Sequence, residues 1–161
     1  MHQDIAKILV SQEKIDEITT RLAKEIDRDY CGEDKRLVLL CILKGSVVFM
    51  GDLMKKITVP MEIDFMKVSS YGAGVETSGF IEVSLDLKRD IKDADIIIIE
   101  DIIDSGRTLQ KLCSLLATRG AHSVKCCTLL DKPSRRQVEM QADYTGIVIP
   151  DEFVVGYGLD F

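Results

Sequence analysis

Three carboxylates and a small polar turn follow the most apolar run of the chain, in the stretch DIIIIEDIIDSGRTL at positions 95–109. Glu100 and Asp101 come directly after Ile96–Ile99, and Asp104 follows two further isoleucines. Carboxylates in such a place can hold Mg²⁺, accept hydrogen bonds from sugar hydroxyls or stabilise a developing cation. One such acid alone is more often an ordinary loop carboxylate or a helix N-cap, so the combination of three is the informative feature.

The residues after Asp104 are suited to binding an anion. Ser105, Gly106 and Thr108 are small, and Gly106 lets the backbone turn tightly and approach a ligand. The helix expected after them offers unpaired N–H groups and the positive end of its dipole, which together favour a phosphate. The spacing matches neither a Walker A loop nor the GxGxxG fingerprint. A phosphorylated sugar fits the pattern, with its phosphate on the turn and its hydroxyls on the acids.

Apolar runs alternate with amphipathic stretches along the chain, which predicts strands alternating with helices. The pattern predicts strands over Leu37–Leu43, Met61–Val68, Phe80–Leu85, Ile96–Ile99, Val124–Leu130, Ile147–Ile149 and Phe153–Val155. It predicts a loop over Ser69–Gly79 and helices over Ser11–Arg28, Val47–Ile57 and Arg107–Arg119, the last ended by Gly120. Buried strands alternating with helices indicate an α/β fold with a doubly wound, mostly parallel sheet. Ligands of such sheets bind beyond the carboxyl ends of the strands, where we expect Glu100 and Asp101 to leave the sheet.

Bulk composition excludes several classes of protein. A length of 161 residues suits one domain, and a net charge of −6 argues against nucleic acid as the main partner. The five cysteines show no CxxC spacing, which argues against a disulfide framework or a zinc site and favours a reducing compartment. The sequence contains neither a secretory signal nor an apolar run of membrane-spanning length. We therefore expect a cytoplasmic protein.

Four further motifs occur in the rest of the chain: LKGS at 43–46, DFMKVSSYG at 64–72, LLDKPSRR at 129–136 and IPDEFVVGYGLD at 149–160. With the stretch at 95–109, they closely resemble the type I phosphoribosyltransferases, and in detail the hypoxanthine-guanine branch of that family. The resemblance covers nearly the whole chain from Leu37 onward. It implies a single phosphoribosyltransferase domain over residues 1–161, with a mostly parallel central sheet flanked by helices, a small hood and a mobile loop.

The family transfers the 5-phosphoribosyl group from 5-phosphoribosyl 1-pyrophosphate (PRPP) to hypoxanthine and guanine, giving IMP or GMP and pyrophosphate. The resemblance implies this activity, with Mg²⁺ as cofactor and small molecules as the only substrates. A non-enzymatic PRPP-sensing regulator on the same fold is the alternative. Such regulators tend to lose base-pocket residues, and the presence of Asp104, Lys132, Phe153 and Asp160 favours the enzyme.

The resemblance assigns the acids and the turn to the sugar phosphate. Glu100 and Asp101 match residues that contact the ribose hydroxyls, directly or through Mg²⁺. Asp104 matches the general base that takes the proton from purine N7, which requires a carboxylate in a closed site. Four consecutive residues match those that hold the 5′-phosphate: Ser105, Gly106, Arg107 and Thr108.

Two other groups match the pyrophosphate and purine sites. Lys44 and Gly45 match the pyrophosphate loop, whose peptide before the lysine is often cis; a solvated lysine at a helix start is the alternative. Lys132 matches the donor to the purine 6-oxo oxygen, although lysine beside a proline is more often a solvated loop residue. Phe153 matches the ring that stacks on the base, and Val154 contacts it through its backbone. On pattern alone, Phe153 is more often a core residue.

The remaining assignments lie near the ends of the motifs. Asp160 matches a carboxylate that holds a second Mg²⁺, and Ser70 and Tyr71 match the tip of a mobile lid, for which a plain surface loop is the alternative. Members of the family usually continue past the position of Phe161 with an arginine that binds pyrophosphate, and we expect full activity to depend on it. The family also implies a homodimer or homotetramer, with no nucleic-acid or membrane partner.

Overall fold

The computed structural model describes residues 5–32, 34–70 and 80–159. Within them, six strands form one sheet in the order β3-β2-β1-β4-β5-β6, and only the β2–β3 pair is antiparallel. The strands are β1 (Leu37–Ile42), β2 (Glu62–Ser70), β3 (Ile81–Leu85), β4 (Asp95–Ile103), β5 (Ser123–Asp131) and β6 (Tyr144–Val148). The helices are α1 (Gln12–Tyr30), α2 (Val47–Met54) and α3 (Arg107–Thr118), with a 3-10 turn η1 (Pro133–Arg135). The α/β fold with a mostly parallel sheet is thus confirmed.

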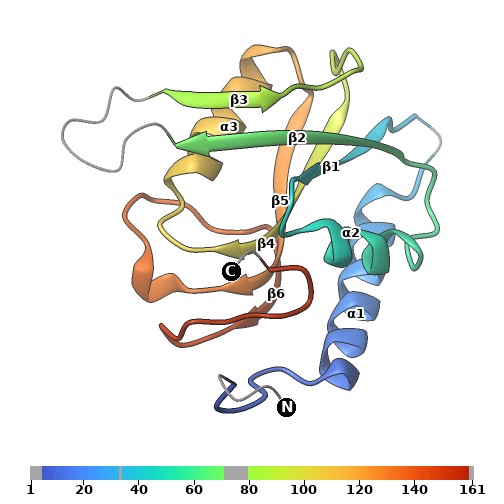
Figure 1. Cartoon of the computed structure of the whole chain (residues 1–161). Helices are drawn as coiled ribbons and strands as arrows, with labels where there is room; N and C mark the ends of the chain where they lie inside the picture. Colours follow the sequence, from blue (N-terminus) through green and yellow to red (C-terminus); the bar gives the residue numbers. More distant parts are fainter. Residues whose placement is uncertain (1–4, 33, 71–79, 160–161) are drawn as a thin grey trace.

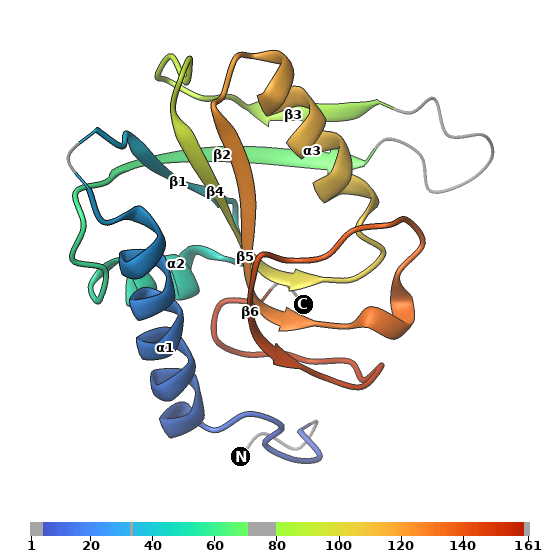
Figure 2. The same cartoon turned by 180° about the vertical axis from the view of Figure 1, so that it is seen from behind.

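The sheet is covered on both faces, with α1 and α2 on one side and α3 on the other (Figures 1 and 2). Leu22 of α1 and Phe49 of α2 share one core cluster with Ile97, whereas Leu112 of α3 packs in a second cluster with Ile98. Successive residues of a strand point to opposite faces, so the run of isoleucines in β4 supplies both cores at once. This burial on both faces explains why β1 and β4 are apolar without alternation.

The ends of α1 and α3 follow from local sequence. The Ser11 side chain accepts a hydrogen bond from the Lys14 backbone N–H at 3.1 Å, as expected for an N-cap. Gly120 ends α3 with a φ of +91°, the left-handed conformation that glycine adopts without steric cost. Both helix boundaries were therefore predictable from single residues.

Several predicted boundaries were wrong. β4 does not end at Ile99 but continues to Ile103, because β5 keeps pairing with it. α2 ends at Met54 rather than Ile57, and the Lys56 N–H bonds back to the Leu53 carbonyl at 3.0 Å in a tighter turn. Ser69 and Ser70 belong to β2 rather than to a loop.

The last predicted strands also differ from the structure. β6 begins at Tyr144, ahead of the predicted Ile147, because Gly146 permits close backbone contact: a Cβ built there would collide with the Leu129 carbonyl of β5. No strand forms over Phe153–Val155; among the described residues, the only bridge nearby joins Gly156 and Leu159. The β-branched residues of this segment have no neighbouring strand to pair with.

The cysteines are unpaired, and the helices are those of a protein without a membrane span in its described part. All five cysteines are free thiols, and Cys41, Cys126 and Cys127 are buried in the core. Burial raises the pKa of each of these three thiols. In the described part of the chain, no helix is both long enough and apolar enough to cross a bilayer.

Candidate functional site

The candidate site lies where β4, β5 and β6 end, on the left of Figure 1, where the turns after β4 and β5 emerge. The pairing of β1 with β4 stops at Cys41–Ile99, but β5 continues alongside β4 to the Ile103–Asp131 pair. Glu100 therefore still lies within the sheet, and the expectation that it leaves the strand was wrong. On the other side, β1 no longer pairs with β4 beyond Ile99, so β4 continues from there with β5 as its partner.

Glu100 and Asp101 point to different sides of the sheet. Asp101 lies against the loop after β1, because a Cβ built on Gly45 would collide with its carboxylate. Glu100 follows the alternation of Ile98 toward the α3 side, and its charge helps to raise the pKa of Cys126 there. No group of three or more potential metal ligands occurs among the described residues.

The loop after β1 is held tightly against the end of β4. The Leu43–Lys44 peptide bond is cis, as the resemblance implied. Ser46 is buried, and its hydroxyl donates a short hydrogen bond to the Ile42 carbonyl. Gly45 is buried against Asp101, whereas Lys44 is exposed. A main-chain loop with a free lysine thus lies next to a carboxylate, which suits an anion together with a cation.

The turn after β4 forms an open helix N-terminus. Gly106 is the N-cap of α3, with a φ of +79°, and as a glycine it has no side chain with which to cap the helix. This arrangement contradicts the alternative in which Asp104 is only an N-cap. A Cβ on Gly106 would lie 3.0 Å from Cδ of Arg136 and 3.1 Å from Cβ of Met140. Glycine is required there, and the N–H groups of the first turn that follow Arg107 are suited to a phosphate.

Asp104 forms an ion pair that the sequence analysis did not assign. Arg135 Nε donates to Asp104 Oδ1 at 3.0 Å, and Arg136 donates to the Asp104 carbonyl at 2.9 Å. The Gln137 N–H donates to the Ser105 carbonyl at 2.9 Å. The chain after β5 therefore lies across the turn that follows β4. Two arginines at the end of the strand next to β4 were the signal that could have indicated this contact.

Lys132 is buried rather than solvated, with 8% of its surface exposed, so the alternative of a surface loop lysine was wrong. Its backbone N–H donates to the Ile103 carbonyl at 3.0 Å, and its ammonium lies 4.0 Å from the Asp151 carboxylate. Phe153 is 77% exposed, so it is not a core residue. Val154 packs partly against the core on the α1 side.

The segment after β6 reaches back to the loop after β1. A Cβ on Gly158 would lie 2.8 Å from Cγ2 of Val48 and 3.5 Å from the Gly45 carbonyl. Tyr157 donates a hydrogen bond to Asp52 of α2. Among the remaining predicted residues, Ser70 is the last residue of β2, while Tyr71 and Asp160 lie outside the described residues.

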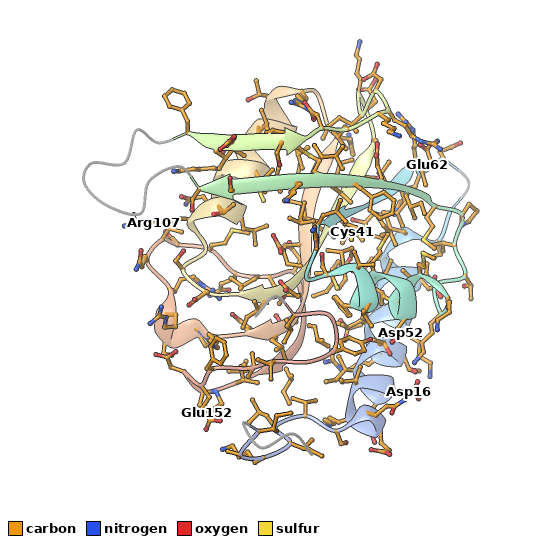
Figure 3. The ribbon with its side chains drawn as sticks, in the orientation of Figure 1. Asp16, Cys41, Asp52, Glu62, Arg107 and Glu152 are labelled. Carbon is orange, nitrogen blue, oxygen red and sulfur yellow. The ribbon has the colours of Figure 1, made fainter. Side chains whose placement is uncertain are left out.

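The side chains near the candidate site lie on one side of the molecule. In Figure 3, Arg107 at the start of α3 and Glu152 after β6 lie on the side where the turns emerge, whereas Asp16 and Asp52 mark the opposite side near α1 and α2. Arg107 is exposed, and its N–H donates to Ser105 Oγ at 3.3 Å. The start of α3 is therefore accessible from solvent at Arg107.

The carboxyl group of Glu100 has a raised pKa. Burial raises the pKa of its carboxyl to about 8, and the nearby Asp101 carboxylate adds to the effect. Burial and the neighbouring carboxylate thus favour the neutral form of Glu100, because a neutral carboxyl does not repel the charge of Asp101. Strongly shifted carboxyls of this kind are frequent in functional sites.

Comparison with known proteins agrees with this geometry. Residues 6–161 match the phosphoribosyl transferase domain family. The chain is 47% identical to the hypoxanthine-guanine phosphoribosyltransferase of Staphylococcus epidermidis, over all of this chain and 89% of that protein. It is 48% identical to the bifunctional protein TilS/HprT of Listeria monocytogenes, but spans only 24% of that protein's length. A crystal structure of a hypoxanthine phosphoribosyltransferase from Staphylococcus aureus superposes with a TM-score of 0.93 at 46% identity, covering 100% of this chain and 86% of that one.

The contact between Gly45 and Asp101 predicts that Gly45→Ala is damaging. The added methyl group must displace the Asp101 carboxylate or the loop, so we expect turnover to fall on the order of 100-fold, because small misplacements in a reacting site are costly. Steady-state kinetics and thermal melting would measure the change. Gly51→Ala in α2 is the matched control, because a Cβ there meets nothing within 4 Å. Equal turnover in the two variants would contradict the proposed role of the contact.

The raised pKa of Glu100 predicts a pH dependence of stability. The folded protein binds the Glu100 proton more tightly than the unfolded chain, whose glutamate titrates near 4.5, so stability is lost as pH rises through about 8. We expect the free energy of unfolding to fall by on the order of 1–3 kcal/mol between pH 5 and 8, the shift being discounted for partial exposure. Glu100→Gln should abolish this fall in urea denaturation.

Glu62→Gln is the control for that experiment. Its hydrogen bond with Arg36 lowers the pKa of Glu62, so its titration lies below the window. The variant should therefore keep the fall between pH 5 and 8. Identical pH profiles for wild type and Glu100→Gln would show that the Glu100 carboxyl is not held in its protonated form.

Proposed function

Because the chain belongs to the phosphoribosyl transferase family, and within it to the hypoxanthine-guanine phosphoribosyltransferases, we propose that it converts hypoxanthine and guanine with PRPP to IMP and GMP. The observation that carries this proposal is the burial of Lys132 beside the end of β4, next to a phosphate-type turn. A buried ammonium at that place is suited to the oxo group of a base, while the turn is suited to the 5′-phosphate of the sugar.

The reaction displaces pyrophosphate from C1 of PRPP. A purine ring nitrogen forms a bond to C1 as the C1–O bond breaks, and pyrophosphate leaves with the electron pair of that bond. The ribosyl group carries positive charge in the transition state, and carboxylates near it are stabilising. Asp104 accepts the proton that purine N7 loses, so the base becomes a better nucleophile as it attacks.

The sugar phosphate would lie along the end of β4. Four residues of the turn and the start of α3 hold the 5′-phosphate: Ser105, Gly106, Arg107 and Thr108. Glu100 and Asp101, consecutive residues at this end of the strand, would contact the ribose hydroxyls directly or through Mg²⁺. The position of these acids supports the proposal. They precede the turn along β4, and the ring hydroxyls of ribose 5-phosphate lie at a distance from its phosphate.

Mg²⁺ fits the residues present. Mg²⁺ prefers oxygen ligands and is usually held by one or two carboxylates together with substrate phosphates rather than by a full protein cage. Asp101 lies against Gly45, where the absence of a side chain leaves its carboxylate directly beside the pyrophosphate loop. Glu100, Asp101 and Asp160 are the residues that would hold Mg²⁺, which when bound neutralises the charge of the pyrophosphate group.

The purine would bind between the turns after β5 and β6. Lys132 donates to the 6-oxo oxygen, which favours hypoxanthine and guanine over adenine, because a 6-amino group cannot accept the hydrogen bond comparably. Phe153 is exposed and can stack on the base, and the Val154 backbone completes the contact. Burial of Lys132 supports this role, since a buried ammonium requires a polar partner.

The pyrophosphate and lid assignments complete the proposal. Lys44 and Gly45 bind pyrophosphate, supported by the exposure of Lys44 and the contact of Gly45 with Asp101. Ser70 and Tyr71 close over the reacting atoms and exclude water. Ser70 ends the strand that leads toward this edge of the sheet.

We also propose a homodimer or homotetramer that works in the reducing cytoplasm, where the five free thiols are stable. Exposed apolar side chains on α2 and β2 support association between copies. They are Val47, Val48, Ile63 and Phe65. Sedimentation velocity tests this assembly, and a species of monomer mass at micromolar concentration would contradict it.

The proposed function is tested by assaying hypoxanthine, guanine, xanthine and adenine, each with PRPP and Mg²⁺. We expect turnover of hypoxanthine and guanine, and slower turnover of adenine by at least about 100-fold because the 6-oxo acceptor is missing. No turnover of any base would refute the enzyme and favour a PRPP-sensing regulator. A preference for adenine would refute the role of Lys132.

Asp104→Asn predicts a separate effect on the chemical step. An amide cannot accept the N7 proton, so we expect kcat to fall by at least about 100-fold, while the Kd for PRPP changes little. Single-turnover kinetics and calorimetry of PRPP binding would measure the two quantities. Asp86→Asn is the control, because it also breaks an exposed ion pair, with Arg119, away from the site. Undiminished kcat in Asp104→Asn would remove Asp104 as the base.

A further inference from the structure

Four charged side chains of alternating sign run in a line at the mouth of the site. Arg135 Nε donates to Asp104 Oδ1 at 3.0 Å, and Arg135 Nη1 lies 3.7 Å from Asp151 Oδ2. The other oxygen of Asp151 lies 4.0 Å from Lys132 Nζ. Arg135 and Asp151 thus connect Asp104 with Lys132. In the proposed function, these two residues make the polar contacts with the base.

The line is built from the ends of three neighbouring strands. Asp104 follows β4, Lys132 and Arg135 follow β5, and Asp151 follows β6. The turn η1 fixes the two cations relative to each other, because the Arg135 N–H donates to the Lys132 carbonyl at 3.0 Å. Residues three apart in a 3-10 turn project to the same side. Both cations therefore face the carboxylate of Asp151.

The chemistry of the base requires a fixed spacing between the two contacts. In a 6-oxopurine, N7 and the 6-oxo oxygen lie on the same edge of the ring system. One carboxylate and one ammonium must therefore approach two nearby positions on this edge at once, without pairing with each other. Direct pairing of Asp104 with Lys132 would neutralise both groups, and an arginine and an acid placed between them prevent it.

We propose that Arg135 and Asp151 are positioning residues that hold Asp104 and Lys132 at the spacing of N7 and the 6-oxo oxygen of a 6-oxopurine. This inference rests on the proposed function. Arg135 binds Oδ1 of Asp104, and in the described part of the chain Oδ2 takes no hydrogen bond, so that oxygen can turn to the substrate. The planar guanidinium can reach two carboxylates, which a point charge such as lysine cannot do equally well.

A surface ion pair without a role in the site is the competing explanation. Arg135, Asp104 and Asp151 are each about half exposed, and such pairs contribute little to stability. The Arg119–Asp86 pair, with contacts of 2.6 and 2.8 Å, has the same chemistry away from the site. This second pair is bidentate and joins the same residue types outside the site, so Arg119→Gln controls for the loss of an arginine–aspartate ion pair as such.

The test compares Arg135→Gln, Asp151→Asn, the double variant and Arg119→Gln in the full chain with PRPP and Mg²⁺. We expect Arg135→Gln and Asp151→Asn each to lower kcat/KM for hypoxanthine about tenfold, because the two contacts lose their spacing. The KM for PRPP and the melting temperature should stay near the wild-type values, as in Arg119→Gln. The double variant should lose little more than either single variant, because both act through one network.

A second readout isolates the contact with the 6-oxo group. The ratio of kcat/KM for hypoxanthine to that for unsubstituted purine, which lacks the oxo group, should fall in Asp151→Asn by about three- to tenfold. A purely structural loss would lower both values together and leave the ratio unchanged. Arg119→Gln should leave both values at the wild-type level.

The outcomes separate the two proposals. If the wild-type protein turns over no base, the proposed function fails and the inference fails with it. If the wild type is active but both variants retain its kcat/KM, only the inference is overturned. Additive losses in the double variant, or an unchanged ratio for the two bases, would likewise overturn the positioning role while leaving the enzyme in place.

Discussion

The pairing of β4 with β5 beyond the point where β1 separates is the constraint on which the site depends. The Lys132 N–H donates to the Ile103 carbonyl, so the turns after these two strands leave the sheet side by side. A phosphate-type turn and a buried lysine, 24 or more positions apart in the sequence, thereby share one edge. Parallel pairing fixes this register, because a slip by one residue would turn every side chain to the other face.

The same strand directs its two acids to different sides of the sheet. Adjacent strand residues face opposite sides, so Asp101 meets the loop after β1 and Glu100 faces α3. Close approach of the Gly45 backbone is possible only without a side chain, and it places the carboxylate beside a loop suited to anions. Burial and the Asp101 carboxylate raise the pKa of Glu100, and this shift lessens the repulsion between the two acids.

Local sequence patterns were sufficient where a single residue or the spacing of apolar residues determines an element. The apolar stripe of α1 and the N-cap Ser11 predicted that helix, and the continuous apolar runs predicted strands buried on both faces. Prediction from the sequence failed where pairing with a neighbouring strand determines the extent of an element. Glu100 ends an apolar run and resembles a strand end, yet β5 keeps β4 in the sheet to Ile103. Phe153 has strand propensity but no strand beside it.

The sequence by itself determined the fold class and the residue types of the site, because hydrophobic period, glycine positions and motif order are local properties. Only the tertiary structure decided that Lys132 is buried, that Gly45 touches Asp101, and that Arg135 pairs with Asp104. Each of these depends on contacts between segments distant in the chain, and periodicity carries no information about which strand ends become neighbours. Their geometry follows from the order of the strands in the sheet, which sets the position of every turn at its edge.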